Sequence, residues 1–244
     1  MNIAVIFAGG TGSRMKSKSI PKQFLEIHGK PVIIHTLEWF EEHPEIDEIV
    51  VVCIESWISH MEKLTEKYGI RKVRKIVPGG ATGQDSIYNG LIAADQIAAG
   101  QRSIVLIHDG VRPLISKELI TDNIESVKKF GSAITCVKVK ETVLMVKEED
   151  EQAIKYVPSR NSTRLARAPQ SFWLDEILAA QEKARAEGKK EFIDSCSLMQ
   201  YYGKEMHLVE GPQENIKITT PDDFYTMRAL LDAREDMQIY GLEE

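Results

Sequence analysis

Short apolar runs alternate along most of the chain with segments of helical periodicity. Runs of about five apolar residues, rich in Val and Ile, predict buried parallel strands, and apolar residues repeated every three or four positions predict helices packed on a sheet. In order, the pattern predicts strands at 3–7, 49–53, 72–77, 103–108, 133–139 and 206–210, and helices at 31–42, 56–68, 89–94, 116–127, 175–187, 192–202 and from 220 onward.

This alternation is typical of an α/β fold, in which helices cover both faces of one mostly parallel sheet. A chain of 244 residues buries one such core, and a second independent domain would be cramped. The sequence contains no repeat, low-complexity segment or linker. We therefore expect a single domain over residues 1–244.

One segment interrupts the alternation. Residues 142–146 alternate between apolar and polar, residues 148–151 are acidic, and residues 153–157 form a second short run. The pattern predicts a two-stranded antiparallel arm at about 140–160. Because an isolated hairpin is marginal in water, we expect the arm to pack against another surface.

Composition excludes several classes of protein. A net charge of −6 argues against a general nucleic-acid binder, so the positive charge that exists is local. Cys53, Cys136 and Cys196 are far apart and lie in or beside apolar segments, which favours buried reduced thiols. The six histidines show no metal-ligand spacing, and no apolar run is long enough to insert in a membrane. With a first strand directly at the N-terminus, we expect a cytoplasmic protein.

A glycine-rich loop at residues 8–23 follows the first predicted strand. Its glycines allow a sharp turn and close approach to a ligand, and its basic side chains with successive backbone N–H groups favour a polyphosphate. The loop fits neither the G-x-x-x-x-G-K-[ST] pattern nor G-x-G-x-x-G, because Met15 stands where the third glycine of the latter belongs. A plain tight turn between strand and helix remains an alternative. The basic residues are Arg14, Lys16, Lys18 and Lys22.

Two further segments follow predicted strands and should meet the loop at the same sheet edge. One is a second glycine-rich turn at 79–86, for which a simple connection between strand and helix remains the alternative. The other begins with Asp109, a hard carboxylate fixed at a strand end and suited to Mg²⁺, or else a turn or capping residue. Arg112 follows it, with a guanidinium that can hold a phosphate.

Within this loop, Ala8-Gly-Gly-Thr-Gly-Ser-Arg-Met15 followed by Pro21-Lys22-Gln23 resembles the signature of nucleotidyltransferases that form sugar nucleotides. More narrowly, it resembles that of the small cytidylyltransferases that act on polyol phosphates. Gly110 departs from the alanine or serine expected in one motif. The motifs that match span residues 2–232 and include His108-Asp-Gly-Val-Arg-Pro113, Val157-Pro-Ser-Arg-Asn161, Ala168-Pro-Gln-Ser-Phe172, Ile193-Asp-Ser195 and Asn215-Ile-Lys-Ile-Thr219.

The resemblance implies a Rossmann-like nucleotidyltransferase domain with a protruding β-arm, which binds CTP, Mg²⁺ and a polyol phosphate and acts as a homodimer. It implies catalytic phosphate contacts for Arg14, Lys22 and Lys217, and a metal contact for Asp109. In relatives the arm crosses to the partner subunit's site. The implied nucleotide-binding residues are Ala8, Gly9, Gly10, Thr11, Gly12, Gly79, Gly80 and Ser86, and those for the polyol phosphate are Arg112, Thr142, Arg160 and Asp194. Arg164 and Arg167 are left without a role, and Glu214 is a candidate second metal ligand.

Two branches of the family compete for the assignment. Phe7-Ala-Gly-Gly10, residues 34–40, residues 83–90 and Val111 look more like the ribitol-5-phosphate branch, which makes CDP-ribitol for cell-surface polymers such as teichoic acid or capsule. The alternative is the 2-C-methyl-D-erythritol 4-phosphate branch of isoprenoid synthesis. A non-catalytic nucleotide-binding regulator is a third reading, against which the intact set of Lys22, Asp109 and Lys217 argues. The phosphate nucleophile, with a second pKa of about 6, needs no general base.

Overall fold

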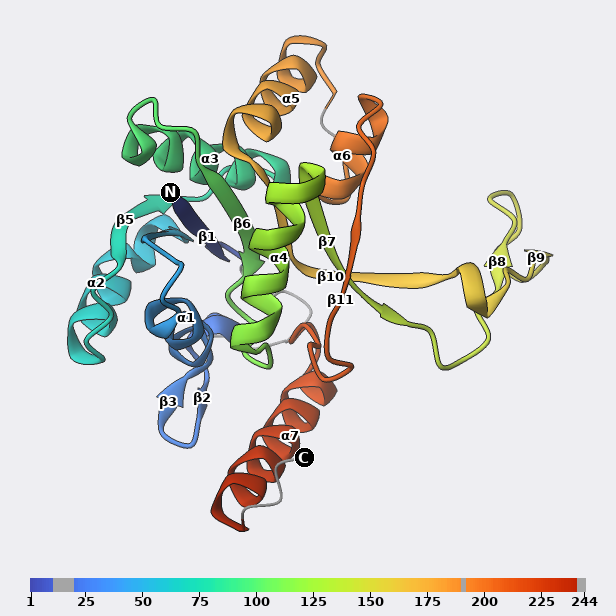
Figure 1. Ribbon diagram of the computed structural model, residues 1–244. Helices are drawn as coiled ribbons and strands as arrows, with labels where there is room; N and C mark the ends of the chain where they lie inside the picture. The colour runs from blue at the N-terminus through green and yellow to red at the C-terminus, as the bar shows by residue number, and fades with distance from the viewer. Residues whose placement is uncertain (11–19, 190–191, 241–244) are drawn as a thin grey trace.

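A seven-stranded sheet crosses the middle of the molecule, in the order β11-β7-β10-β6-β1-β4-β5 (Figure 1). The structure is a computed structural model that describes residues 1–10, 20–189 and 192–240. All neighbouring strands run parallel except β10, which is antiparallel to both β6 and β7. The strands are β1 (Asn2–Ala8), β4 (Glu48–Cys53), β5 (Val73–Pro78), β6 (Ile104–Asp109), β7 (Ser132–Lys138), β10 (Arg164–Trp173) and β11 (Leu208–Glu210).

Helices cover both faces of this sheet, as the alternating pattern predicts. Along β1, Ala4 and Ile6 face the layer that contains α1, α2 and α4, whereas Ile3 and Val5 face the layer of α3, α5 and α6. Successive strand side chains point to opposite faces, so one apolar run contributes to two cores. The helices are α1 (Val32–Glu42), α2 (Ile58–Lys67), α3 (Gly83–Ala98), α4 (Lys117–Phe130), α5 (Leu174–Ala186), α6 (Ser195–Tyr201) and α7 (Pro221–Tyr240).

Gly90 allows helix α3 to pack directly on the side chains of the sheet. A Cβ at Gly90 would stand 2.5 Å from Val5 Cγ1 and 2.8 Å from Val52 Cγ2, so no larger residue fits without a shift. Thr82 caps the helix by accepting a hydrogen bond from the Asp85 backbone N–H. Glycine in a helix interior costs roughly 0.5–1 kcal/mol relative to alanine, and here it permits the close packing.

Two parts of the sheet architecture are not predicted by the sequence pattern. Strand β10 follows the arm, in a stretch where no strand is predicted, and it is inserted antiparallel between β6 and β7. A small hairpin, β2 (Glu26–Ile27) with β3 (Lys30–Pro31), turns through His28 and Gly29 at φ values of 53° and 71°. The sequence pattern does not reveal these strands because none of them carries a continuous apolar run.

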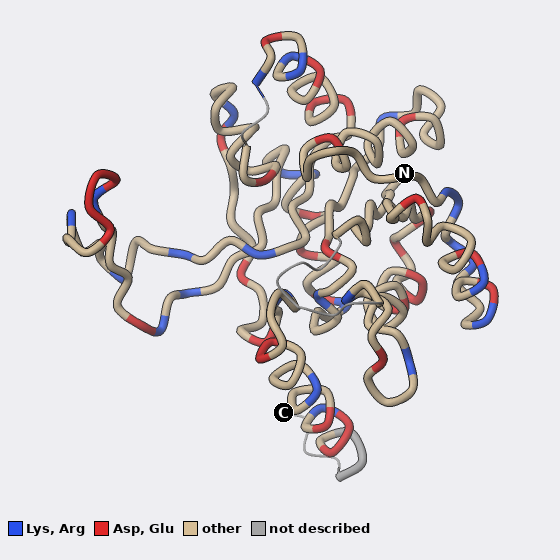
Figure 2. The backbone as a smooth tube through the Cα atoms, turned by 180° about the vertical axis from the view of Figure 1, so that it is seen from behind, with Lys and Arg blue, Asp and Glu red and all other residues tan. Residues whose placement is uncertain are grey.

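The arm is a hairpin of β8 (Met145–Val146) and β9 (Ile154–Tyr156), and it projects far from the rest of the molecule (Figure 1). The prediction of an antiparallel arm is confirmed, although its strands are shorter than the alternation suggests. Acidic residues gather at its tip (Figure 2). Apolar side chains of the arm are exposed to solvent, namely Leu144, Met145, Val146, Ile154, Tyr156 and Val157.

No helix among the described residues combines the length and apolar character needed to cross a membrane. The three cysteines form no disulfide, and Cys53 and Cys136 are buried, as expected from their apolar surroundings. Burial raises the pKa of the Cys53 and Cys196 thiols to about 11, so both stay protonated at neutral pH.

Candidate active site

A cavity of about 820 Å³ opens at the carboxyl ends of the central parallel strands. It is lined by the start of the glycine-rich loop, the turn before α3, the segment after β6, part of β10, the start of α6 and Lys217. The three segments predicted to share a sheet edge therefore do meet there. This is the position at which parallel α/β sheets bind ligands, because loops and helix N-termini converge on it.

Asp109 lies at the centre of a charged cluster at the end of β6. Its Oδ1 accepts a hydrogen bond from Lys217 Nζ at 2.6 Å, and its Oδ2 accepts one from Arg112 Nε at 2.8 Å. Arg112 also donates to the backbone oxygen of Asn215 at 2.9 Å. Burial alone would raise the pKa of Asp109, but the charges of Lys217 and Arg112 outweigh it and hold that pKa well below its usual range. The carboxylate is therefore ionised at neutral pH.

Lys22 enters the cavity from a short 3₁₀ turn that follows the glycine-rich loop. The residue is only 8% exposed, and its Nζ donates to the backbone oxygen of Ile218 at 2.8 Å. A Cβ at Gly10 would lie 3.8 Å from Lys22 Cε, so the side chain runs alongside the start of the loop. Lys22 and Lys217, distant in the sequence, are thus brought to one cavity.

The turn between β5 and α3 is held by the Ser86 hydroxyl. Its Oγ accepts from the Gly80 N–H at 3.0 Å and donates to the Thr82 backbone oxygen at 3.0 Å. A Cβ at Gly80 would lie 2.2 Å from Asp85 Cβ, and one at Gly79 would lie 3.9 Å from Gly9 Cα. The turn requires glycine for close packing, and it lies directly beside the first glycine-rich loop.

On the opposite side of the cavity, Asp194 and Gln170 form a hydrogen-bonded pair. Gln170 Nε2 donates to Asp194 Oδ2 at 2.8 Å, and its Oε1 accepts from the Cys196 N–H at 2.9 Å. The other oxygen of Asp194 accepts from the Ser197 N–H at 2.8 Å and caps α6. Asp194 thus lines the cavity and also has a structural role.

Several cavity-lining residues are absent from the set that the sequence predicts. Phe192, Ile193 and Ser195 precede or begin α6, and Arg167 and Gln170 lie on β10. Gln170 belongs to a motif that carries the family resemblance, which is the signal that identifies it. Arg167 is noticeable in the sequence as an extra cation, but nothing there indicates that it is half-buried beside a cavity.

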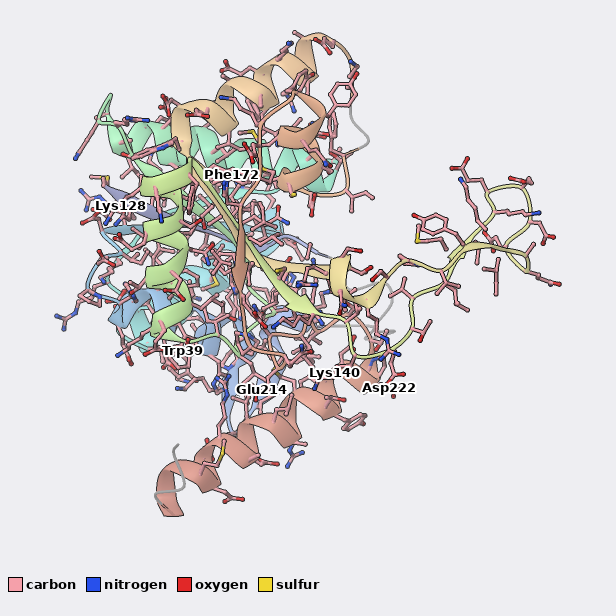
Figure 3. The ribbon with its side chains drawn as sticks, turned by 45° about the vertical axis from the view of Figure 1, so that its right-hand side comes forward. Trp39, Lys128, Lys140, Phe172, Glu214 and Asp222 are labelled. Carbon is pink, nitrogen blue, oxygen red and sulfur yellow. The ribbon has the colours of Figure 1, made fainter. Side chains whose placement is uncertain are left out.

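The structure does not bring every predicted residue to this cavity. Thr142 and Arg160 lie at the arm, where Arg160 Nη1 donates to the Lys140 backbone oxygen at 3.4 Å, and neither lines the cavity of its own chain. Lys140 marks the point where the arm leaves the body (Figure 3). Glu214, the candidate second metal ligand, is paired at 2.8 Å with Arg234 of α7 and does not line the cavity. Thr11, Gly12 and Arg14 lie outside the described residues.

The described residues contain no group of three or more His, Cys, Asp or Glu side chains arranged to hold a metal. His108, next to Asp109, is buried and its Nε2 is hydrogen-bonded to the Arg112 backbone oxygen at 3.0 Å. Burial lowers the pKa of His108 to about 4, so the ring is neutral at pH 7. The cavity thus offers cations, one ionised strand-end carboxylate and backbone donors, which suit phosphate chemistry better than nucleophilic or general-base catalysis.

Fold and site together define a nucleotidyltransferase of the α/β class. Residues 2–233 match the family described as IspD, 2-C-methyl-D-erythritol 4-phosphate cytidylyltransferase, and the chain belongs to this family.

Among its relatives is the ribitol-5-phosphate cytidylyltransferase of Streptococcus agalactiae serotype V, which is 53% identical over 99% of this chain and 100% of that protein. The 2-C-methyl-D-erythritol 4-phosphate cytidylyltransferase of Clostridium botulinum strain Langeland is 41% identical over 95% and 97%. The solved 4-diphosphocytidyl-2C-methyl-D-erythritol synthase of Anaerococcus prevotii superimposes with a TM-score of 0.82, at 31% identity, over 95% of this chain and 96% of that one. The family resemblance of the sequence motifs and the expected fold class are confirmed.

Proposed function

We propose that the protein transfers CMP from CTP to D-ribitol 5-phosphate and releases CDP-ribitol and pyrophosphate. The observation that carries the proposal is the 53% identity, over essentially the full length of both chains, with a ribitol-5-phosphate cytidylyltransferase. A relative named for methylerythritol phosphate is 41% identical. The ribitol-like residues around Phe7 and Val111 favour the same branch.

Charge in the cavity supports a reaction between two polyanions. Among the described residues, four cationic side chains line it, against the two carboxylates of Asp109 and Asp194, although the whole chain carries a net charge of −6. The cations are Lys22, Arg112, Arg167 and Lys217. Such local positive charge concentrates phosphates and stabilises the negative charge that builds up during phosphoryl transfer.

CTP would occupy the side of the cavity formed by the β1 loop and the β5–α3 turn. Glycine backbone N–H groups and Lys22 face the triphosphate there, and the turn at Gly80 and Ser86 encloses the base. The polyol phosphate would lie on the β10 and α6 side, near Asp194. A phosphate oxygen of the acceptor then attacks the α-phosphorus in line, the bond to the pyrophosphate oxygen breaks, and pyrophosphate leaves.

Lys22 and Lys217 would offset charge on the phosphates as this displacement proceeds. The attacking oxygen belongs to a phosphate whose second pKa is about 6, so it is already anionic at neutral pH. That agrees with a cavity whose histidine, His108, is neutral and hydrogen-bonded to backbone. Positioning and electrostatics therefore account for the chemistry.

Mg²⁺ fits Asp109. The carboxylate is ionised and lies beside the proposed phosphate site, and Mg²⁺ is typically held by one or two carboxylates together with substrate phosphates. When bound, the ion neutralises phosphate charge and helps to orient the leaving group. Because Lys217 and Arg112 occupy both oxygens of Asp109, these two cations would have to share the carboxylate or turn toward the phosphates.

We also propose that the arm packs against a second copy of the chain and carries Thr142 and Arg160 toward the partner's polyol phosphate. Two observations support this arrangement. The apolar residues of the arm, including Leu144 and Ile154, are about half exposed in a single chain. Arg160 lies away from the cavity of its own chain, so a catalytic role would require a second site within reach.

Pyrophosphate release from CTP tests the proposal when D-ribitol 5-phosphate and 2-C-methyl-D-erythritol 4-phosphate are supplied separately. We expect the higher kcat/KM with ribitol 5-phosphate. A preference for the methylerythritol compound would assign the chain to the other branch. Absence of turnover with both, while CTP still binds, would indicate a nucleotide-binding regulator.

A further inference from the structure

Arg167 is a cation without a partner among the described residues. The residue lines the cavity from β10 and is half-buried, and its Nε is buried without a hydrogen bond. Burial lowers the pKa of Arg167, with a further contribution from the nearby charge of Arg112. A partly desolvated charge that lacks a counter-ion is costly, so its retention here points to an anionic ligand.

The acidic residues that line the same cavity are already engaged. Asp109 accepts from Lys217 and Arg112, and Asp194 accepts from Gln170 and the Ser197 N–H. Neither carboxylate is paired with Arg167 in the described structure. Among the described residues, no carboxylate that lines the cavity is therefore left to pair with Arg167, which favours a ligand as the source of the anion.

The place of Arg167 in the sheet indicates which ligand this is. Strand β10 lies on one side of β6, whereas β1, β4 and β5, which lead into the proposed nucleotide site, lie on the other. Arg167 lines the cavity together with Gln170 of the same strand and with Asp194 and Ser195 at the start of α6. Ser195 Oγ is also buried and without a hydrogen bond, as expected for a polar group whose partner is a ligand hydroxyl.

We propose that Arg167 binds the phosphate monoester of the polyol phosphate acceptor within its own subunit. The inference rests on the proposed function, because it assumes a phosphorylated acceptor. A guanidinium can donate two parallel hydrogen bonds to a phosphate, which fixes the orientation of the phosphate as well as its position. Arg167 thus helps to aim the attacking oxygen from the side opposite the nucleotide.

The test is steady-state pyrophosphate release by Arg167→Met and Arg167→Lys, with KM measured separately for CTP and for the acceptor. Methionine keeps much of the apolar stem and removes the charge. Loss of a charge-assisted bidentate contact should raise the acceptor KM by roughly 10- to 100-fold. The KM for CTP should change less than about twofold, because Arg167 is not expected to contact the nucleotide. Lysine keeps the positive charge but cannot donate two parallel hydrogen bonds as a guanidinium does, so Arg167→Lys should raise the acceptor KM less.

Arg164→Met is the matched control. Arg164 lies on the same strand, but its guanidinium donates to the backbone oxygens of Asn161 and Thr163 at 3.0 and 2.9 Å, and it does not line the cavity. This variant should retain the wild-type KM for both substrates. If Arg167→Met does not fold, the acceptor KM of Arg167→Lys decides the question in the same way.

An unchanged acceptor KM in the Arg167 variants would overturn the inference, as would an increase confined to the KM for CTP. Measuring the KM for each of the two polyol phosphates allows this inference to be tested separately from the proposed function. If the wild type prefers the methylerythritol compound, the ribitol assignment fails, but Arg167 is still tested by the KM for that phosphate. If the wild type uses neither acceptor, both proposals fall.

Discussion

The body of the molecule and its arm bury apolar side chains to very different extents. Ile6 in β1 is fully buried, whereas Ile154 in β9 is 54% exposed. The two side chains are chemically identical, so the difference comes from their surroundings. The body completes its core within one chain, and the arm presents apolar surface that one chain leaves uncovered. The body is therefore expected to be stable alone, and the arm to depend on a second copy.

The largest expected difference is between the unfolding free energies of a variant in the core and a variant in the arm. Phe172→Ala removes a fully buried ring between the sheet and α5 (Figure 3) and should cost about 3–5 kcal/mol of unfolding free energy. Ile154→Ala, measured by urea unfolding at concentrations too low for association, should change it by less than about 0.5 kcal/mol. Sedimentation should instead show weaker self-association for Ile154→Ala. Equal destabilisation by both variants would mean that the arm is part of the body's folding unit.

Within the body, the cavity lysines should have the largest effect on catalysis. Lys22→Ala and Lys217→Ala should each lower turnover roughly 100-fold or more, because each removes a positive charge from the proposed phosphate site. The melting temperature should stay close to that of the wild type. Lys128→Ala, on the exposed face of α4, is the control with a similar loss of charge. Near-normal turnover in either cavity variant would remove that lysine from the mechanism.

Asp109→Asn should lower the rate by about tenfold or more and raise the Mg²⁺ concentration needed for half-maximal activity. Asparagine keeps the shape of the side chain but loses the charge that holds Lys217 and Arg112. The measurement is turnover against Mg²⁺ concentration at saturating CTP. An unchanged magnesium response would show that the nucleotide alone holds the ion.

The arm can be examined by subunit complementation. Arg160→Ala subunits and Lys22→Ala subunits should each be nearly inactive, and mixing them should restore roughly a quarter of wild-type activity. Half of randomly paired dimers are mixed, and each mixed dimer has one complete site. Differently tagged subunits allow the mixed dimers to be isolated. If isolated mixed dimers remain inactive, the sites are not shared between subunits.

The smallest expected effect is a pH dependence of the unfolding free energy that arises from histidines of the body. His43 is buried; its Nδ1 accepts from the Glu45 N–H, and its Nε2 is hydrogen-bonded to the Lys117 backbone oxygen. Burial lowers the pKa of His43 below that of the unfolded chain, so the unfolded state binds the proton more readily. The unfolding free energy should therefore fall as the pH drops below about 6.5, by up to about 1.4 kcal/mol for one histidine at pH 5.5.

Urea unfolding at pH 7.5 and 5.5 measures this effect, and His43→Gln should flatten the dependence. His35 and His108 also have lowered pKa values and would leave a residual slope. The arm contains no histidine, so deletion of its tip should not alter the slope. A slope unchanged by His43→Gln would mean that other groups carry the acid sensitivity.

The sequence predicts the body well wherever burial on both faces demands a continuous apolar run, as in β1 and β6. It also predicts the arm, because alternation and an acidic turn are local signals. It does not predict β10, whose Arg167, Pro169 and Gln170 break any apolar pattern. That strand forms because β6 and β7 both offer backbone partners, and this pairing depends on tertiary structure.

The candidate site divides in a similar way. Glycines at turns, a carboxylate after a strand and lysines beside motifs are visible in the sequence, so Asp109, Lys22 and Lys217 can be identified there. The pairing of Asp109 with two cations cannot be predicted, because Arg112 and Lys217 reach it from different segments. Arg167 is visible as a residue, but that it has no counter-ion among the described residues becomes apparent only in the folded chain.

The close contact at Gly90 has a consequence for base selection. Ser86, which holds the turn around the proposed base site, lies one helical turn before Gly90 on α3. A change in the distance between α3 and the sheet is therefore expected to change the width of the proposed base site. An added methyl group at Gly90 would push against Val5 and Val52 and move that rim outward. Gly90 does not line the cavity, yet its small size allows α3 to lie close to the sheet. A search for variants that accept larger bases should therefore begin at this position.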